Sequence, residues 1–395
     1  METKKALPIL FLVMFLVMVG FGIIIPVIPF YAEEIGASPA QLGWLMAVYS
    51  LMQLLFAPVW GRISDRIGRK PVIAIGIAGL SLSFFLTAFS SQLWMLFAAR
   101  IIGGMLSSAN MPTVMAYVAD ITSEENRGKG MGIIGAATGL GFIFGPAIGG
   151  MFSKISLTMP FYIAGTTSAL TLILVLFILK ESLTEESKLN QTQKKASIWS
   201  AFKGSVSILF MLQLFISLSL SGLEATFAYF AAKKAGLGTV QLGYIFMIMG
   251  LASAVVQGGL IGRLTKKFGE GTVIQGGIIV SAIGFACILL VDSFATAALF
   301  LTIFGVGNGV IRPTVSALIT KRSMAGHGSS TGLLSSFDSL GRIIGPPLGG
   351  WLFSIQAGLP YISGAVLSLI AFVLYRIYAI KSSKTIFYKP ELNRK

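Results

Sequence analysis

The stretch GLGFIFGPAIGG at residues 139–150 carries five glycines and a proline inside a long apolar run. It returns about two hundred residues later as SLGRIIGPPLGG at 339–350. Glycine inside a helix costs about 1 kcal/mol relative to alanine, so such a span needs another source of stability. In a membrane, small residues let helices approach closely, and neighbours or water satisfy the carbonyl that proline leaves unbonded. The two stretches therefore predict bent, closely packed membrane helices in two halves of one repeat.

The composition is that of a membrane protein. Of 395 residues, 55% are hydrophobic and only 11% are charged, whereas a soluble domain carries about 25% charged residues. A helix needs about 20 apolar residues to cross a hydrocarbon core of about 30 Å. The sequence predicts an all-α integral membrane protein with 12 transmembrane helices. The twelve apolar runs are 7–30, 41–60, 71–90, 93–115, 130–153, 159–179, 206–230, 241–262, 273–291, 296–319, 330–353 and 359–380.

The distribution of basic residues predicts the topology. An even number of spans puts both termini on one side of the membrane, and cytoplasmic loops are enriched in Lys and Arg. With cytoplasmic termini, the outside loops hold only Lys154, Lys233 and Lys234 of the 30 Lys and Arg residues. The net charge of +15 is then a topology signal, and binding to nucleic acid is not expected. We predict a multi-pass protein of the bacterial cell membrane with both termini in the cytoplasm.

Other stretches repeat at a similar offset. QLGWLMAVYS from Gln41 matches QLGYIFMIMG from Gln241, and GRISDRIGRKPVI from Gly61 matches GRLTKKFGEGTVI from Gly262. A long polar segment divides the spans six and six, so both halves enter the membrane in the same orientation. Such parallel repeats rock around a substrate site between them. The predicted domains are a six-helix bundle at 1–180, a cytoplasmic linker at 181–205, a second, pseudo-symmetric six-helix bundle at 206–380 and a cytoplasmic tail at 381–395.

Nearly the whole chain resembles the major facilitator superfamily. GRISDRIGRK at 61–70 is similar to that family's signature between the second and third spans. The stretch GFGIIIPVIP at 20–29, Arg100 in the fourth span and the glycine-rich 135–150 resemble motifs of its twelve-span drug:proton antiporters. Among these, the resemblance is to the multidrug and quinolone efflux pumps of Gram-positive bacteria.

The resemblance implies two mechanical elements. The first is a latch that holds the two halves closed on the cytoplasmic side, and its residues are Gly61, Asp65, Arg66, Gly68 and Arg69. Its two glycines are expected to permit a tight turn. The second copy has Lys266 in place of the aspartate and is expected to act only as an anchor. The second element is the bend and packing surface of the antiporter motif, formed by Gly135, Gly139, Gly145, Pro146, Gly149 and Gly150.

Charged residues at membrane depth are costly and are functional candidates. Glu224 lies deep in the seventh predicted span with no basic residue near it in sequence. A buried carboxyl group can hold either a proton or a cation, which suffices for exchange. The resemblance implies a proton-coupling and cation-binding role for Glu224 and a part in the proton site for Arg100 and Arg312. An assembly role, in which Glu224 pairs with an arginine, is the alternative.

A second acid is harder to assign. Many of the related pumps carry an acidic residue three positions before Arg312, where this chain has Gly309. Asp338 is a hypothesis for the missing carboxylate. Asp338 and Arg342 have the i, i+4 spacing of a pair on one helix surface, so mutual neutralisation and a coupling role are equal alternatives. Asp120 and Asp292 lie near span ends and are expected to be interfacial caps.

The predicted function is proton-coupled export of amphipathic, often cationic, drugs or toxic compounds. Aromatic faces attract organic cations, and the predicted substrate contacts are Glu224, Gln53, Phe142, Tyr229, Asn308 and Phe337. The partners are a small-molecule substrate, protons and the lipid bilayer, and a monomer is expected. One cysteine and one histidine argue against a metal cluster, and neither an enzyme nor a cofactor is expected. The alternatives are an exporter of one metabolite, siderophore or lipid, and a membrane sensor or binding protein without transport.

Overall fold

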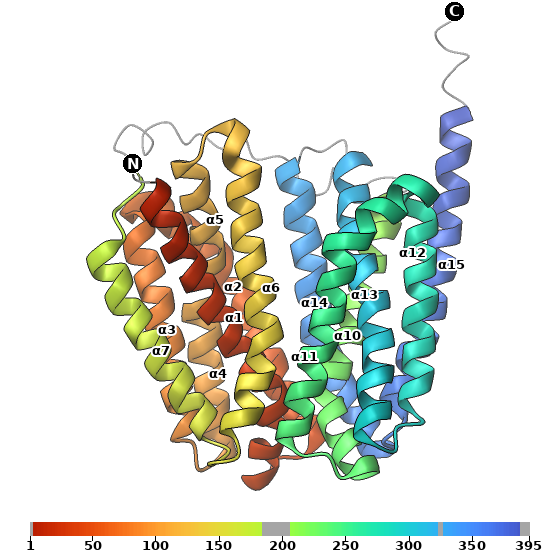
Figure 1. The fold of residues 1–395 in the computed structure, drawn as a ribbon, viewed down its shortest axis with the longest axis horizontal. Coiled ribbons are helices and arrows are strands. Elements are labelled where there is room, and N and C mark those ends of the chain that lie inside the picture. Colours follow the sequence, from red (N-terminus) through yellow and green to blue (C-terminus); the bar gives the residue numbers. More distant parts are fainter. Residues whose placement is uncertain (1–2, 184–205, 323–326, 388–395) are drawn as a thin grey trace, which may run out of the picture. The chain divides into compact units, whose positions relative to one another are not determined.

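The computed structural model describes residues 3–183, 206–322 and 327–387, and every regular element in these ranges is a helix (Figure 1). From 184 onward the predicted linker lies outside the described residues, as does the tail from 388 onward. The helices are α1 (Thr3–Glu34), α2 (Pro39–Ile67), α3 (Arg69–Ala88), α4 (Leu93–Ser107), α5 (Asn110–Ile121), α6 (Glu124–Phe152), α7 (Met159–Ile178), α10 (Val206–Ala235), α11 (Thr239–Val255), the π-helical turn η1 (Val256–Leu260), α12 (Ile261–Ile288), α13 (Phe294–Arg322), α14 (His327–Ile355) and α15 (Leu359–Phe387).

Nine helical segments of the described residues are long and apolar enough to cross a membrane. The predicted span 93–115 is divided between α4 and α5, and neither part is among the nine. The predicted spans 241–262 and 273–291 fall in one continuous segment, Thr239–Ile288. The span predicted at 330–353 corresponds to α14, which carries more polar residues. The chain is thus helical and rich in candidate spans, and the count of twelve stays a prediction.

By their contacts, the residues divide into two compact units. Unit 1 comprises residues 1–193 and 227–247, and unit 2 comprises residues 194–226 and 248–395. The helix α10 therefore contributes its first part to unit 2 and its last part to unit 1. The predicted domain boundaries stay a prediction, because the expected linker lies mostly outside the described residues.

In unit 1, α1 packs along α6 through glycines (Figure 1). Gly141, Gly145 and Gly149 lie at this contact. A Cβ added at Gly145 would stand 2.6 Å from the carbonyl oxygen of Val19, and one at Gly149 would stand 2.9 Å from that of Ile23. Only glycine leaves room for two backbones at this separation, which is how small residues hold membrane helices together.

Unit 2 repeats this contact between α10 and α14. Gly341, Gly345 and Gly349 lie there, at the matching positions of the repeat. A Cβ added at Gly341 would stand 2.7 Å from the backbone nitrogen of Leu218, and one at Gly349 would stand 3.0 Å from the carbonyl oxygen of Gly222. The repeat seen in the sequence is therefore a repeat of helix packing.

Close packing expected at two further glycines is not observed. A Cβ added at Gly135 or Gly139 would meet no atom within 4 Å. With 3.6 residues per turn, Gly139 and Gly141 project to nearly opposite sides of α6. The packing face of the motif is therefore formed by Gly141, Gly145 and Gly149.

Candidate functional site

A carboxylate in unit 2 gathers four donors from three helices. Asp338 on α14 accepts hydrogen bonds from Arg312 Nη2 on α13 at 2.7 Å and from Arg342 Nε one turn along α14 at 3.3 Å. From α10, Gln213 Nε2 donates to it at 3.0 Å, and the hydroxyl of Ser217 donates to the same oxygen. The i, i+4 pair predicted from spacing is present within this larger set. We call these five residues the Asp338 cluster.

Glu224 on α10 faces the same charges from a more enclosed position. Glu224 is only 2% exposed to solvent, and its Oε1 has no hydrogen-bond partner among the described residues. It interacts electrostatically with Arg342 and Arg312. An ionised carboxylate in a low-dielectric interior is costly unless it is paired and hydrogen-bonded. A proton or a cation at this oxygen would relieve that cost, which is the chemistry that exchange requires.

In unit 1, a row of aromatic rings connects two predicted site residues. Phe142 and Phe21 have ring centroids 6.3 Å apart, and Phe21 and Tyr49 are also 6.3 Å apart. The guanidinium carbon of Arg100 lies 4.3 Å from the centroid of the Tyr49 ring, a cation–π contact. Arg100 is 4% exposed, and its Nε has no partner among the described residues. Sequence reasoning selected Arg100 and Phe142 but missed the two rings between them.

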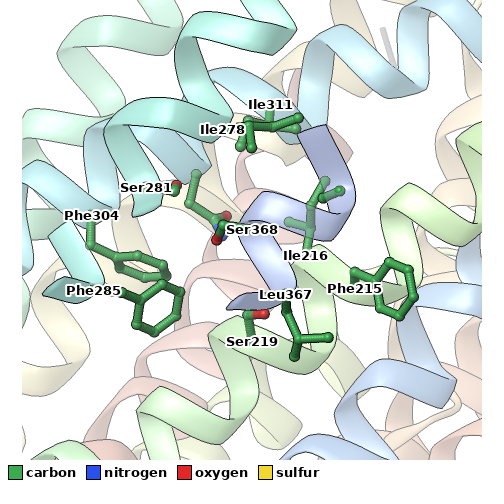
Figure 2. Close-up of a pocket in the computed structure, with 12 residues that line it drawn as sticks. Phe215, Ile216, Ser219, Ile278, Ser281, Phe285, Phe304, Ile311, Leu367 and Ser368 are labelled. Carbon is green, nitrogen blue, oxygen red and sulfur yellow. The ribbon is translucent and has the colours of Figure 1, made fainter. Parts of the chain in front are cut away.

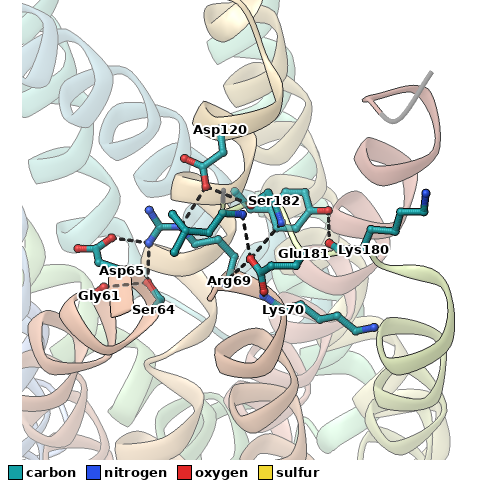
Figure 3. Close-up of polar contacts among 11 residues, drawn as sticks. Gly61, Ser64, Asp65, Arg69, Lys70, Asp120, Lys180, Glu181 and Ser182 are labelled. Atoms are coloured by element: carbon teal, nitrogen blue, oxygen red, sulfur yellow. Dashed lines mark hydrogen bonds and ion pairs between the residues drawn. The ribbon is translucent and has the colours of Figure 1, made fainter. Parts of the chain in front are cut away.

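The loop between α2 and α3 is organised by Arg69 (Figure 3). This buried side chain donates from Nη1 to the hydroxyl of Ser64 at 2.8 Å and to the Asp65 carboxylate. Its Nε donates to Asp120 Oδ2 at 3.0 Å. Asp120, expected to be an interfacial cap near the end of a span, is also a direct partner of Arg69. Arg66 is exposed and forms no ion pair within the described ranges.

Glu181, which follows α7, closes the start of α3 (Figure 3). Its Oε1 accepts from the backbone N–H of Arg69 at 2.7 Å, and its Oε2 from that of Lys70 at 3.0 Å. A carboxylate at a helix N-terminus is favoured by the helix dipole. Gly68 has φ 113°, and a Cβ there would collide with the Glu181 carboxylate. Gly61 instead lies inside α2, so the tight turn predicted to use both glycines depends on Gly68.

The second copy of this loop carries its ion pair with the charges reversed. Glu270 pairs with Lys321 in unit 2, and these positions correspond in the repeat to Arg69 and Asp120. Gly269 corresponds to the turn glycine of the first copy and has φ 80°. The expectation that this copy acts as an anchor stays a prediction, and the ion pair is compatible with it. Its aspartate is replaced, but an ion pair joins α12 to α13, the next helix along the chain.

Asn308, a predicted substrate contact, lines a small cavity of about 20 Å³ inside unit 2. Figure 2 shows the other residues of its wall. The cavity lies between α10, α12, α13 and α15. Phe285 and Phe304 form part of its wall with ring centroids 4.7 Å apart, and Ser281 and Ser368 add hydroxyl groups. Its enclosure by helices of a single unit fits water better than a drug. The substrate contact at Asn308 stays a prediction.

Two other predicted substrate contacts, Tyr229 and Phe337, are in contact with neighbouring residues. Tyr229 is 7% exposed, and its hydroxyl donates to the carbonyl oxygen of Pro29 at 2.9 Å within unit 1. The ring of Phe337 stacks on Phe210 with centroids 5.6 Å apart. Both side chains thus serve packing in this structure. Gln53 is partly exposed on α2 and forms no hydrogen bond within the described part of the chain.

The end of the antiporter motif meets the part of α11 that belongs to unit 1. A Cβ added at Gly150 would stand 2.7 Å from the carbonyl oxygen of Thr239, and one at Gly243 would stand 2.5 Å from that of Pro146. The hydroxyls of Ser153 and Thr239 are 2.6 Å apart. The motif is therefore a packing surface on two sides, against α1 and against α11.

Asp292 behaves as the expected cap of a span end. It is exposed just before α13, and the hydroxyl of Thr296 donates to its Oδ1 at 2.9 Å. Hydrogen bonds from Thr296 and Ser293 hold the pKa of this carboxyl below its usual range. The residue thus stays ionised at neutral pH and is available as a control in tests of the buried acids.

Comparison with known proteins agrees with this architecture. The family model described as Major Facilitator Superfamily matches residues 10–330 and 258–390. Multidrug resistance protein 1 of Bacillus subtilis is 33% identical over 377 residues, which cover 95% of this chain and 96% of that protein. The quinolone resistance protein NorA of Staphylococcus aureus is 29% identical over 378 residues, with coverage of 95% and 96%. Among solved structures, the nucleoside transporter NupG superposes with a TM-score of 0.78 at 16% identity, covering 95% of this chain and 99% of that one.

Proposed function

The chain belongs to the major facilitator superfamily, and we propose that it is a proton-coupled antiporter that exports amphipathic drugs by alternating access. Members of this superfamily are membrane transporters, so the chain is a transporter and not an enzyme. It is a multi-pass protein of the bacterial plasma membrane. Its relatives include proteins named for multidrug and quinolone resistance, which supports drug efflux.

One observation carries the proton-coupling part of the proposal. Glu224 is fully enclosed, one of its oxygens lacks a hydrogen-bond partner among the described residues, and two guanidinium groups act on it. When a cationic drug occupies this carboxylate, the proton is excluded, and when the proton occupies it, the drug is released. Mutually exclusive occupancy is sufficient to couple the two fluxes in opposite directions.

Asp338 has a different role in this proposal. Its oxygens accept from two guanidinium groups, an amide and a hydroxyl, so protonation would have to displace bonded donors. We assign it to positioning, holding Arg312 and Arg342 beside Glu224. Arg100, seated on Tyr49, is the corresponding fixed charge of unit 1.

The proposed topology has twelve spans in two six-helix halves, with both termini and the loop around Arg69 in the cytoplasm. The glycine contacts α1–α6 and α10–α14 keep each half rigid during rocking. The proposed latch uses Asp65, Arg69 and Asp120 to hold the loop in the shape that closure requires.

The test is dye transport into inverted membrane vesicles. With an imposed proton gradient, the wild type should accumulate ethidium, and Glu224→Gln should lower gradient-driven uptake about tenfold or more, because the amide cannot exchange a proton. The matched control is Asp292→Asn, which makes the same change at an exposed acid and should transport like the wild type. Gradient-driven uptake that survives in Glu224→Gln with unchanged pH dependence would remove Glu224 from the mechanism.

A further inference from the structure

The small cavity inside unit 2 has an apolar side and a polar side. It offers about 20 Å³ between α10, α12, α13 and α15 (Figure 2), and about 10–15 Å³ is enough to hold one water molecule. Phe285 and Phe304 belong to the apolar side. The polar side has the hydroxyls of Ser281 and Ser368 and the amide of Asn308. The cavity therefore has the size and the polar groups for a water and is too small for an organic ligand.

One hydroxyl in this wall is buried without a partner. Ser281 is 4% exposed, and its Oγ has no hydrogen-bond partner among the described residues. It lies at the contact of α12 with α13, where a Cβ added at Gly307 would stand 2.7 Å from this oxygen. Burying a hydroxyl without a hydrogen bond is costly, and native proteins satisfy most such groups with protein atoms or ordered water. The Ser281 hydroxyl therefore needs a small ligand that can accept or donate a hydrogen bond.

Two further polar groups of the wall can bind the same ligand. Asn308 is 7% exposed, and neither end of its amide is hydrogen-bonded within the described ranges. The hydroxyl of Ser368 donates to the carbonyl oxygen of Gly364 at 2.9 Å, which leaves its oxygen able to accept a hydrogen bond. A buried water makes about two to four hydrogen bonds. The side chains of Ser281, Asn308 and Ser368, from α12, α13 and α15, supply that number.

The first copy of the repeat has an apolar residue where Ser281 lies. Four buried positions of α3 match four buried positions of α12, and three of them carry identical residues. The matched pairs are Ile73 with Ile274, Ile77 with Ile278, Leu80 with Ser281 and Phe84 with Phe285. A serine is smaller than a leucine and carries a hydroxyl that needs a partner. Both differences favour a bound water in the second copy.

We propose that this cavity is a water site, in which one water molecule bonds to Ser281 of α12 and bridges it to Asn308 of α13 and Ser368 of α15. The water joins three helices of unit 2 at a buried point of their contact. Asn308, predicted as a substrate contact, then binds this water. The proposal is independent of the proposed function, because it rests on burial and hydrogen bonding alone.

The first test uses the sign of a change in stability. Ser281→Ala removes one hydrogen bond of the water and should lower the melting temperature of the detergent-solubilised protein by about 1–2 °C. The matched control is Thr302→Val on α13, because the Thr302 hydroxyl is also buried without a partner in the described part of the chain but does not line the cavity. Replacing an unbonded hydroxyl by a methyl group should leave the melting temperature unchanged or raise it. If Ser281→Ala behaves like Thr302→Val, the Ser281 hydroxyl binds no water and the proposal is overturned.

The second test concerns the bridge between helices. Ser281→Ala and Ser368→Ala weaken the binding of the same water, so the double variant should lose less stability than the sum of the two single losses. The control pairs Ser281→Ala with Ser363→Ala, since the Ser363 hydroxyl donates to Pro360 on α15 and does not line the cavity. These two losses should add. Additive losses for Ser281→Ala and Ser368→Ala as well would show that the two hydroxyls share no water.

A third measurement needs no substitution. X-ray radiolysis converts bound water into hydroxyl radicals, which modify the side chains next to it. Phe285 lines the cavity, whereas its match Phe84 follows Leu80 in the first copy. Both residues are buried, at 1% and 3% exposed, so radicals from bulk solvent should reach neither ring. We expect modification of Phe285 and none of Phe84 in the wild type. Equal yields at the two rings would overturn the water site.

Discussion

The helix pair α1–α6 in unit 1 and the pair α10–α14 in unit 2 are built alike but carry different chemistry. Both are joined through glycines at matching positions of the repeat. In the first pair, the Thr138 hydroxyl bonds to its own helix and Phe142 joins an aromatic row. In the second, the matching positions are Asp338 and Arg342, which form an ionic cluster. The two copies share the glycine-mediated helix packing, and only the α10–α14 pair carries charged residues at these positions.

The shared glycines should have large effects in both copies. Gly145→Ala and Gly345→Ala each push a Cβ against a backbone carbonyl of the neighbouring helix, and overpacking of this kind costs about 1–3 kcal/mol. Both variants should lower the melting temperature of the detergent-solubilised protein and its yield in membranes. The matched control is Gly139→Ala on α6, where the Cβ meets no atom within 4 Å. Equal stability of Gly139→Ala and Gly145→Ala would contradict the packing face assigned here.

The next prediction concerns the stability cost of a substitution at matching positions of the two copies. Asp338→Asn removes the anion shared by two arginines, and breaking a buried pair costs about 3–5 kcal/mol, less here because Arg312 is partly exposed. The matching change, Thr138→Val, should cost about 0.5 kcal/mol or less, since the hydroxyl bonds only within its helix. Thermal unfolding of the two variants measures the difference.

The same variant tests the role of Asp338 in coupling. If it positions the arginines, Asp338→Asn should slow dye efflux while the dependence of the residual rate on the proton gradient stays as in the wild type. Loss of that dependence, with efflux down a drug gradient retained, would make Asp338 a proton carrier and contradict the positioning role. Glu224→Gln provides the reference for an uncoupled pump.

The sequence was sufficient for features that depend on local spacing. The repeated glycines predicted close packing, the i, i+4 spacing predicted the Asp338–Arg342 pair, and the isolated acid in an apolar run predicted a buried Glu224. In contrast, Gly135 was expected to pack, because spacing alone does not show which side of a helix meets a neighbour.

Partners supplied by distant segments could not be predicted. Asp120 and Glu181 reach the α2–α3 loop from 51 and 112 residues further along the chain than Arg69. Gln213 meets Asp338 across 125 residues. Each of these side chains has an ordinary local context, and only the packing of helices brings it to the site. A useful signal was available in the repeat, since Glu270 and Lys321 match Arg69 and Asp120 with opposite charges.

A smaller effect is expected at the two turn glycines. Gly68 and Gly269 both have positive φ, 113° and 80°, where a side chain costs about 1 kcal/mol or more. Gly68→Ala should be the more destabilising, because its Cβ also collides with the Glu181 carboxylate, whereas the Cβ of Gly269→Ala meets no atom within 4 Å. Melting temperatures of the two variants should show this order. The reverse order would mean that Glu181 does not close the turn.

The smallest effect should be the coupling in the charge-reversed pair Glu270–Lys321, and a double-mutant cycle for each ion pair compares it with the first copy. Arg69 is 5% exposed in its side chain and binds two carboxylates, so the coupling between Arg69→Gln and Asp120→Asn should be about 1–3 kcal/mol. The side chain of Lys321 is 67% exposed, and exposed pairs contribute about 0.2–1 kcal/mol. Added salt should weaken the second coupling more than the first, because solvent ions screen exposed charges. Equal couplings with equal salt dependence would show that burial of Arg69 does not distinguish the first loop from its charge-reversed copy.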